Sequence, residues 1–329
     1  MSVTMAQALN GALRDAMAED ATVLVFGEDV GQLGGVFRVT DGLTAEFGDT
    51  RCFDTPLAES GIVGTAIGMA MYGFRPVVEM QFDAFAYPAF EQITSHVAKM
   101  RNRTRGYVEL PLVIRIPYGG GIGGVEHHCD SSEAYYTHTP GLTVMTPSNP
   151  ADAYSMLREA IASDDPVIFL EPKRCYWSKA DIELPIRTEA SGRAVVRRSG
   201  DDVTLITYGA MVGVCLEAAA AAAEDGRSVE VVDVRSLSPF DAETVAASVR
   251  RSGRALVVHE ASTFGGYGAE VVARITEMCF HHLLAPIGRV GGLDVPYPPP
   301  SLEQHHLPTV DRILDAVDRL QWEDGRVGA

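Results

Sequence analysis

A single carboxylate among small and apolar neighbours is the first candidate for chemistry. Glu59 lies in the segment DTPLAESGIVGTAIG, residues 54–68, close to Leu57 and to an apolar run that begins at Ile62. Because burial disfavours the ionised form, we expect the pKa of Glu59 to be raised. A carboxyl group that keeps its proton near neutral pH can act as a general acid or donate to a ring nitrogen. The same position suits a cap of the glycine-spaced helix that follows, and this segment alone favours the cap.

A cluster of histidines is the second candidate. His127, His128 and His138, together with Cys129, follow the glycine loop YGGGIGGV at residues 118–125. Zinc binding is disfavoured because no HxxxH or CxxC pair places ligands on one face. A Cys–His nucleophile pair is also disfavoured, since a catalytic base normally reaches its nucleophile from elsewhere in the fold. The remaining interpretation is one or two histidines at the mouth of a cleft that titrate near neutral pH, with His127 the better candidate for a solvated loop residue.

The glycine loop itself contains a formal GxGxxG at Gly119, Gly121 and Gly124. A run this rich in glycine matches the spacing by chance, and no helix with an apolar period follows it. A nucleotide-binding oxidoreductase would therefore rest on this loop alone, without a helix N-terminus for a pyrophosphate.

Further candidates lie where expected strands end. Glu28 follows the β-branched strand at residues 22–26, at the edge where open α/β sheets place ligands. Phe82 and Phe85 follow the strand at residues 75–80. Aromatic side chains usually belong to the core, but one of the two could stack on a flat ligand ring.

The elements that must position these residues alternate between strands and helices. The 329 residues suffice for two domains, and 46% hydrophobic with 22% charged residues is typical of a folded globular protein. Because both halves alternate, we expect an α/β fold with two largely parallel sheets flanked by helices. We place the domains at residues 1–185 and 201–329, with a linker at 186–200.

Three local expectations concern the neighbourhood of the site. The pattern predicts a helix over residues 87–100 and a strand over 255–258 that ends at His259 and Glu260. The position of these two residues favours a site, but a structural role at an interface fits equally well. The proline-rich segment 295–300 is too rigid for a helix and is expected to pack as an extended arm.

Charge and composition exclude several classes of function. The net charge of −17 argues against binding to nucleic acid or to anionic membranes. The chain has no basic and apolar leader, and no apolar run approaches the roughly 20 residues that span a bilayer. Five scattered cysteines without CxxC spacing indicate reduced thiols rather than disulfides or a zinc knuckle. We expect a cytoplasmic protein.

Eight segments carry a resemblance to a known family. In chain order they are TVLVFGEDV, RCFDTPLAESGIVGTAIGMA, MQFDAFAYPAFEQ, the glycine loop with EHHCDSSEAYYTHTPGL, DDPVIFLEPKRCY, SLSPFD, HEAS and DVPYPPP. In order and spacing they resemble the E1 beta subunit of thiamine diphosphate-dependent 2-oxo acid dehydrogenases, and the likeness spans nearly the whole chain. It looks closest to the bacterial branched-chain type, with pyruvate as the alternative substrate. The resemblance implies two transketolase-like domains, the first of which binds a pyrimidine.

The resemblance also implies roles for individual residues. Glu59 matches the glutamate that hydrogen-bonds the aminopyrimidine N1' of thiamine diphosphate. Phe85 matches an aromatic residue against that ring, and Leu57 lies beside it. Together with Glu28, a candidate because of its place at a strand end, these form the predicted cofactor-binding set. His128 matches the active-site histidine of an HSQSPE-like segment, which reads HCDSSE here, so that His127 competes for the role.

The resemblance further implies that this chain holds half of an active site. The family binds the diphosphate through Mg²⁺ with a GDG segment, and this chain contains no GDG. An E1 alpha subunit would supply that half in an α2β2 heterotetramer, and the C-terminal domain would be available to the E2 lipoyl acyltransferase. A potassium site would use main-chain oxygens of Ile114, Ala160, Ser163 and Asp165. A non-catalytic scaffold subunit remains the alternative from another class.

Overall fold

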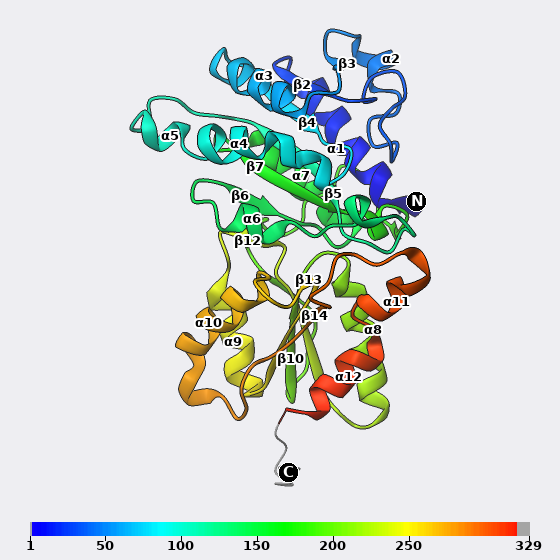
Figure 1. The fold of residues 1–329 in the computed structure, drawn as a ribbon, viewed down its shortest axis with the longest axis vertical. Helices are drawn as coiled ribbons and strands as arrows, with labels where there is room; N and C mark the ends of the chain where they lie inside the picture. The colour runs from blue at the N-terminus through cyan, green and yellow to red at the C-terminus, as the bar shows by residue number, and fades with distance from the viewer. Residues whose placement is uncertain (1, 321–329) are drawn as a thin grey trace.

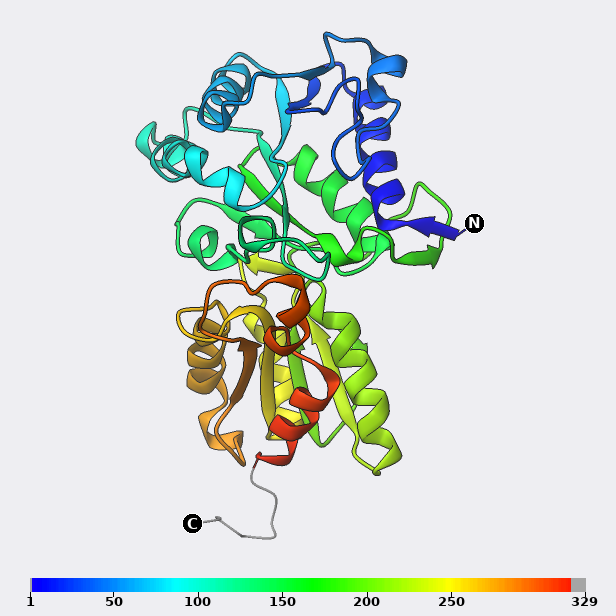
Figure 2. The same cartoon turned by 45° about the vertical axis from the view of Figure 1, so that its right-hand side comes forward.

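The computed structural model describes residues 2–320, which fold into two α/β halves. The halves lie one above the other along the long axis of the molecule (Figure 1), and they remain separate layers after a turn of 45° (Figure 2). The alternation of strands and helices thus predicted the fold class correctly, as an α/β protein with largely parallel sheets.

A seven-stranded sheet forms the centre of the first half, in the order β12-β6-β7-β5-β4-β2-β3. Its strands pair in parallel except for β12, which is antiparallel to β6. The strands are β2 (Val23–Gly27), β3 (Cys52–Asp54), β4 (Arg75–Glu79), β5 (Val113–Tyr118), β6 (Thr143–Met145), β7 (Val167–Pro172) and β12 (Ser236–Ser238).

A five-stranded sheet forms the second half, in the order β14-β13-β10-β11-β9. Here β9 is antiparallel to β11, and the other neighbours are parallel. The strands are β9 (Val195–Arg198), β10 (Val203–Thr207), β11 (Val229–Asp233), β13 (Ala255–Ser262) and β14 (Gly288–Gly292), while β1 (Ser2–Thr4) and β8 (Lys179–Asp181) form a separate antiparallel pair.

Two strands lie across the expected division of the chain. β9 lies within residues 186–200, which we expected to be a linker, and forms the edge of the second sheet. β12 follows β11 in sequence but completes the first sheet. The domain boundaries at 185 and 201 stay a prediction.

Helices cover both faces of each sheet. On the first sheet, α1 (Met5–Glu19) and α7 (Pro150–Ala162) pack on one face, while α3 (Glu59–Met71) packs on the other. The start of α7 follows from its sequence, because Asn149 accepts a hydrogen bond from the Asp152 amide and Pro150 occupies the first turn. The other α-helices are α2 (Leu43–Phe47), α4 (Phe90–Gln92), α5 (Met100–Arg103), α6 (Glu133–Thr137), α8 (Met211–Glu224), α9 (Ala242–Ser252), α10 (Gly268–Cys279), α11 (Glu303–His306) and α12 (Val310–Asp318).

The helix expected over residues 87–100 is divided into short pieces. A 3₁₀ segment, η1 (Ala84–Ala89), precedes α4, and a π-helical turn, η2 (Ile93–Val97), precedes α5. Pro88 lies inside η1 and has no amide hydrogen to donate, so the regular α-helical pattern does not extend through it. No helix within residues 2–320 is both long and apolar enough to cross a membrane.

An apolar core continues from one half into the other. One buried cluster contains Ile116 and Tyr136 from the first half and Tyr208 and Tyr267 from the second. The two halves are therefore joined by packed side chains as well as by β12.

A buried arginine crosslinks three neighbouring strands of the first sheet. Arg115 on β5 donates through Nε and Nη2 to Glu171 on β7 at 2.7 and 2.9 Å, and through Nη1 to Glu79 on β4 at 2.6 Å. The Tyr176 hydroxyl donates to the same Glu171 carboxylate at 2.6 Å. Because Arg115 and Glu171 have no exposed surface, each charge depends on its partner for solvation.

Arg115→Ala should lower the free energy of unfolding by about 3–5 kcal/mol, because it leaves two buried carboxylates without a counter-charge. Urea unfolding followed by circular dichroism measures the loss. Arg101→Ala is the matched control, since the Arg101–Asp165 ion pair is about half exposed and its removal should cost less than about 1 kcal/mol. Equal losses for the two variants would contradict the role of Arg115.

Candidate active site

One edge of the first sheet gathers the candidate site residues. Glu28 follows β2, Phe82 and Asp83 follow β4, the glycine loop follows β5, and Lys173 follows β7. Because these strands are parallel neighbours, their carboxyl ends meet at the same edge. The topology therefore brings together residues that are up to 145 positions apart, counting from 28 to 173.

Glu59 is the first residue of α3 and is 9% exposed. The capping position belongs to Ala58, and no side-chain capping hydrogen bond is made at this helix end. The local preference for a cap was therefore wrong. The carboxylate instead lies in the first turn, where the helix dipole favours negative charge.

Glu28 lies beside Glu59 and is 8% exposed. Burial raises the pKa of Glu28, and the negative charge of Glu59 raises it further, whereas the Ala58 amide opposes the shift. Oε1 of Glu28 is buried without a hydrogen-bond partner. An unpaired buried oxygen next to a second carboxyl group is a site that a hydrogen-bond donor from a ligand would satisfy.

A cavity of about 360 Å³ adjoins the start of α3. It is lined mainly by apolar groups, including the stacked rings of Phe26 and Phe53, whose centroids are 5.0 Å apart. Ala58 and Ile62 form its wall beside Glu59. Leu57, two residues before α3, is 78% exposed.

His128 packs against two aromatic rings. The centroid of its imidazole lies 4.5 Å from that of Phe82 and 5.3 Å from that of Phe85, both edge to face. Burial lowers the pKa of His128, with smaller contributions from His127 and Lys173. The imidazole is therefore neutral at neutral pH and can accept a proton.

The structure distinguishes His128 from its neighbours. His127 is exposed, whereas His128 is half-buried between the aromatic rings. Cys129 is buried, and burial raises the pKa of its thiol to about 11, so the thiolate is scarce at neutral pH. Within residues 2–320 there is no group of three or more His, Cys, Asp or Glu side chains that could hold a metal ion.

Asp83 and Lys173 are site residues that the sequence reasoning missed. The Lys173 ammonium group is buried without a hydrogen-bond partner and lies 5.6 Å from the centroid of the Phe82 ring. Burial lowers the pKa of Lys173 and raises that of Asp83 to about 7, although each attracts the charge of the other. Lys173 directly follows β7 and Asp83 lies a few residues after β4, and these positions near strand ends were the signal that could have identified them.

A buried carboxyl group joins the histidine segment, residues 126–133, to the second half of the molecule. Glu133, the first residue of α6, accepts a 2.7 Å hydrogen bond from the Tyr208 hydroxyl and has no exposed surface. Burial raises the pKa of Glu133 to about 7. The Tyr208 ring in turn lies parallel to that of His259, at 6.3 Å.

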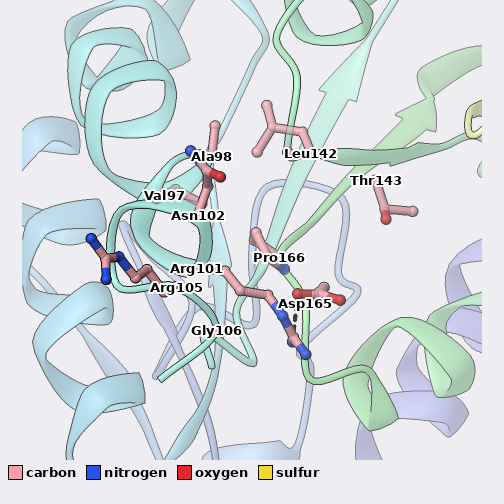
Figure 3. A pocket seen from close by; sticks show the side chains of 11 residues that line it. Val97, Ala98, Arg101, Asn102, Arg105, Gly106, Leu142, Thr143, Asp165 and Pro166 are labelled. Atoms are coloured by element: carbon pink, nitrogen blue, oxygen red, sulfur yellow. Dashed lines mark hydrogen bonds and ion pairs between the residues drawn. The ribbon is translucent and has the colours of Figure 1, made fainter. Parts of the chain in front are cut away.

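A separate cavity of about 520 Å³ lies away from these residues, between α5 and the turn before β7 (Figure 3). Arg101 pairs with Asp165 across it, at 2.8 Å. The main chain near Asp165 already has partners, since Arg75 donates to the Ser163 carbonyl at 2.9 Å and the Ser163 hydroxyl donates to that of Asp165 at 3.0 Å. The potassium site at Ile114, Ala160, Ser163 and Asp165 stays a prediction.

Comparisons with known proteins agree with this architecture. The transketolase pyrimidine binding domain matches residues 1–177, and the transketolase C-terminal domain matches residues 192–313. A Mycobacterium tuberculosis protein named 3-methyl-2-oxobutanoate dehydrogenase subunit beta is 55% identical over 97% of this chain and 92% of its own length. The chain belongs to the 2-oxo acid dehydrogenase E1 beta subunits.

Other relatives of this E1 beta subunit carry a second name. A Leifsonia xyli pyruvate dehydrogenase E1 component subunit beta is also 55% identical, over 97% of this chain and 94% of its own. A Staphylococcus aureus protein of the same name is 46% identical over 95% of this chain and 97% of its own length. Among solved structures, a chain described as "Split gene transketolase, inactive beta4 tetramer" matches with a TM-score of 0.79, at 25% identity, over 97% of this chain and 98% of that one.

The candidate residues at the edge of the first sheet lie within the domain that the family comparison matches. The domain matched as pyrimidine-binding is the one that carries Glu28, Glu59, Phe85 and His128. The structure brings Phe85 into contact with His128, and Glu28 into electrostatic contact with Glu59. The roles of these residues, and of Leu57, stay predictions.

In this E1 beta subunit, Glu133→Gln should change how stability depends on pH. Wild-type Glu133 keeps its proton up to about pH 7 when folded but loses it near pH 4.5 when unfolded. Its stabilising contribution is therefore complete below pH 4.5 and is lost as the pH rises through 7. Glutamine keeps the acceptor for Tyr208 without ever ionising. Between pH 4.5 and 8 the variant should gain about 3 kcal/mol in unfolding free energy relative to wild type.

Urea unfolding at several pH values measures this difference. Glu224→Gln, at an exposed position of α8, is the control, and its difference from wild type should change by less than about 0.5 kcal/mol over the same range. A Glu133→Gln curve parallel to that of wild type would show that folding does not raise the pKa of Glu133.

Proposed function

We propose that this chain is the beta subunit of the E1 component of a cytoplasmic branched-chain 2-oxo acid dehydrogenase complex. With an alpha subunit it would carry out the thiamine diphosphate-dependent oxidative decarboxylation of branched-chain 2-oxo acids and the reductive acylation of E2 lipoyl groups. The observation that carries the proposal is the pair of buried carboxyl groups, Glu28 and Glu59, at the edge of a pyrimidine-binding domain.

Glu59 is assigned to the pyrimidine of the cofactor. Its place in the first turn of α3, beside the unpaired Oε1 of Glu28, supports a hydrogen bond to the ring nitrogen N1'. Burial and the negative charge of Glu59 raise the pKa of Glu28, which favours the protonated form of this carboxyl group beside Glu59. Thiamine diphosphate, when bound, supplies the electron-accepting ring that lets carbon dioxide leave a 2-oxo acid.

His128 is assigned to proton transfer near the substrate or the lipoyl group. The lowered pKa keeps its imidazole neutral, so it can take up a proton and return it. Phe82 and Phe85 limit its motion and exclude water from one side of the ring. Phe85 is further assigned to contact the pyrimidine ring, with Leu57 beside it.

The part of the active site that this chain lacks is assigned to an E1 alpha subunit in an α2β2 heterotetramer. No GDG segment occurs in the chain, and residues 2–320 hold no side-chain cluster for a metal, so Mg²⁺ would be bound mainly by alpha. The exposed side chain of Leu57, two residues before Glu59, would be accessible to such a partner. The E2 lipoyl acyltransferase would dock on the C-terminal domain.

Two alternatives have specific support. The 55% identity to a pyruvate dehydrogenase subunit equals that to the branched-chain subunit, so pyruvate is the second substrate candidate. The resemblance to a structure described as an inactive beta4 tetramer supports a non-catalytic scaffold for the chain without its partner. A comparison of kcat/KM for 3-methyl-2-oxobutanoate and pyruvate decides which of the two is the preferred substrate.

Glu59→Ala, in a complex co-expressed with the alpha subunit, should lower the rate of decarboxylation by at least about 100-fold, because it removes the carboxyl group from the pyrimidine. The rate is measured with an artificial electron acceptor in saturating thiamine diphosphate and Mg²⁺. Glu183→Gln, an exposed carboxyl group of the same domain, should leave the rate within about twofold of wild type. Full activity of Glu59→Ala would refute the assignment.

A further inference from the structure

The glycine loop between β5 and the histidine segment binds carboxylates of the second half. The Gly120 amide donates to Oε1 of Glu260, which lies on β13. The Gly121 amide donates to Oε1 of Glu303, the first residue of α11, at 2.9 Å. The amides that a nucleotide-binding loop would offer to a phosphate are thus occupied by acidic side chains of the same chain.

A tyrosine from the proline-rich arm completes this contact. The Tyr297 hydroxyl donates to Oε1 of Glu303 at 2.6 Å, and the Gly121 amide lies 3.3 Å from the same hydroxyl oxygen. A Cβ atom at Gly120 would overlap the Tyr297 hydroxyl, and one at Gly121 would overlap the Arg174 side chain. Glycine at position 120 is therefore required for Tyr297 of the second half to approach the loop this closely.

The glycines that bind these carboxylates and His128 belong to one closed loop. The Gly119 amide donates to the Asp130 carbonyl at 2.7 Å, which closes residues 119–130 into one loop. His128 lies on the opposite limb, where it contacts Phe82. Just after the loop, the Ser132 amide donates a 3.1 Å hydrogen bond to the Asp83 carboxylate. The loop is thus held from the first half on one side and from the second half on the other.

We infer that Glu260, Tyr297 and Glu303 are positioning residues, which hold the glycine loop so that His128 stays against Phe82. Glu260 and Glu303 bind the Gly120 and Gly121 amides of the loop directly, and the Tyr297 hydroxyl donates to Glu303. The inference rests on the proposed role of His128 for its effect on the reaction, but the loop contact itself can be measured without any activity.

Glu303 offers the sharpest test because it is only half-buried and its contact depends on one acceptor oxygen. In the co-expressed complex, Glu303→Ala should speed amide hydrogen exchange in residues 118–128 by about tenfold or more, since the Gly121 amide loses its closer acceptor and keeps only the Tyr297 hydroxyl at 3.3 Å. Glu303→Gln keeps a carbonyl oxygen at this position and should exchange within about threefold of wild type. Tyr297→Phe is a second variant, with a smaller increase expected, and the exposed Glu277→Ala on α10 is the control.

The kinetic arm separates positioning from general support of the fold. Glu303→Ala should lower kcat/KM roughly tenfold in the wild-type background but less than about twofold in a His128→Ala background, because both changes act on the same group. Glu303→Gln should restore the rate. An equal loss in both backgrounds, or unchanged exchange in Glu303→Ala and Tyr297→Phe, would overturn the inference. A wild-type complex without decarboxylase activity would refute the proposed function, while the exchange measurements would still decide the loop contact.

Discussion

The buried Arg115 with its two carboxylates is the interaction on which the candidate site depends. It joins β4, β5 and β7, whose carboxyl ends carry Phe82, the glycine loop and Lys173. Such a triad need not be more stabilising than an apolar core, but a strand slip of one residue would turn a charge to the opposite face. The register of the three strands is thereby specified.

The same network continues to His128 through packed rings. Glu171 accepts from Tyr176, whose ring stacks on Phe37 at a centroid distance of 4.5 Å. Phe37 meets the edge of Phe82 at 5.7 Å, and Phe82 contacts His128 at 4.5 Å. The position of the imidazole is therefore coupled to a buried ion network on the face of the sheet covered by α1 and α7.

Much of the fold could be predicted from periodicity and from chemistry local to the chain. The buried strand around Arg115 and the start of α7 at Asn149 depend on neighbours in sequence. Glu28 and Phe82 were identified because each follows a strand. Glu59 and the histidines were candidates from their local chemistry, and the resemblance then assigned roles to Glu59 and His128, in the domain that the family comparison matches as pyrimidine-binding.

The remaining features depend on contacts between distant residues. His259 and Glu260 were expected at a strand tip, but β13 continues to Ser262, because β14 pairs with it and extends it. The pKa values of Asp83 and Glu133, near 7, arise from complete burial by segments that no local pattern relates. Local sequence patterns likewise do not predict the addition of β12 to the first sheet or the contact of Glu303 with the glycine loop.

The central claim is that Glu28, Glu59 and His128 form one half of a cofactor site. The most direct measurement is calorimetric titration of thiamine diphosphate with Mg²⁺ into the isolated chain, the isolated alpha subunit and the assembled complex. Saturable binding is expected for the complex, with binding to the isolated chain at least about 100-fold weaker, because the proposal assigns most of the anchoring groups to the alpha subunit. Binding to the isolated chain as tight as that to the complex would contradict the claim.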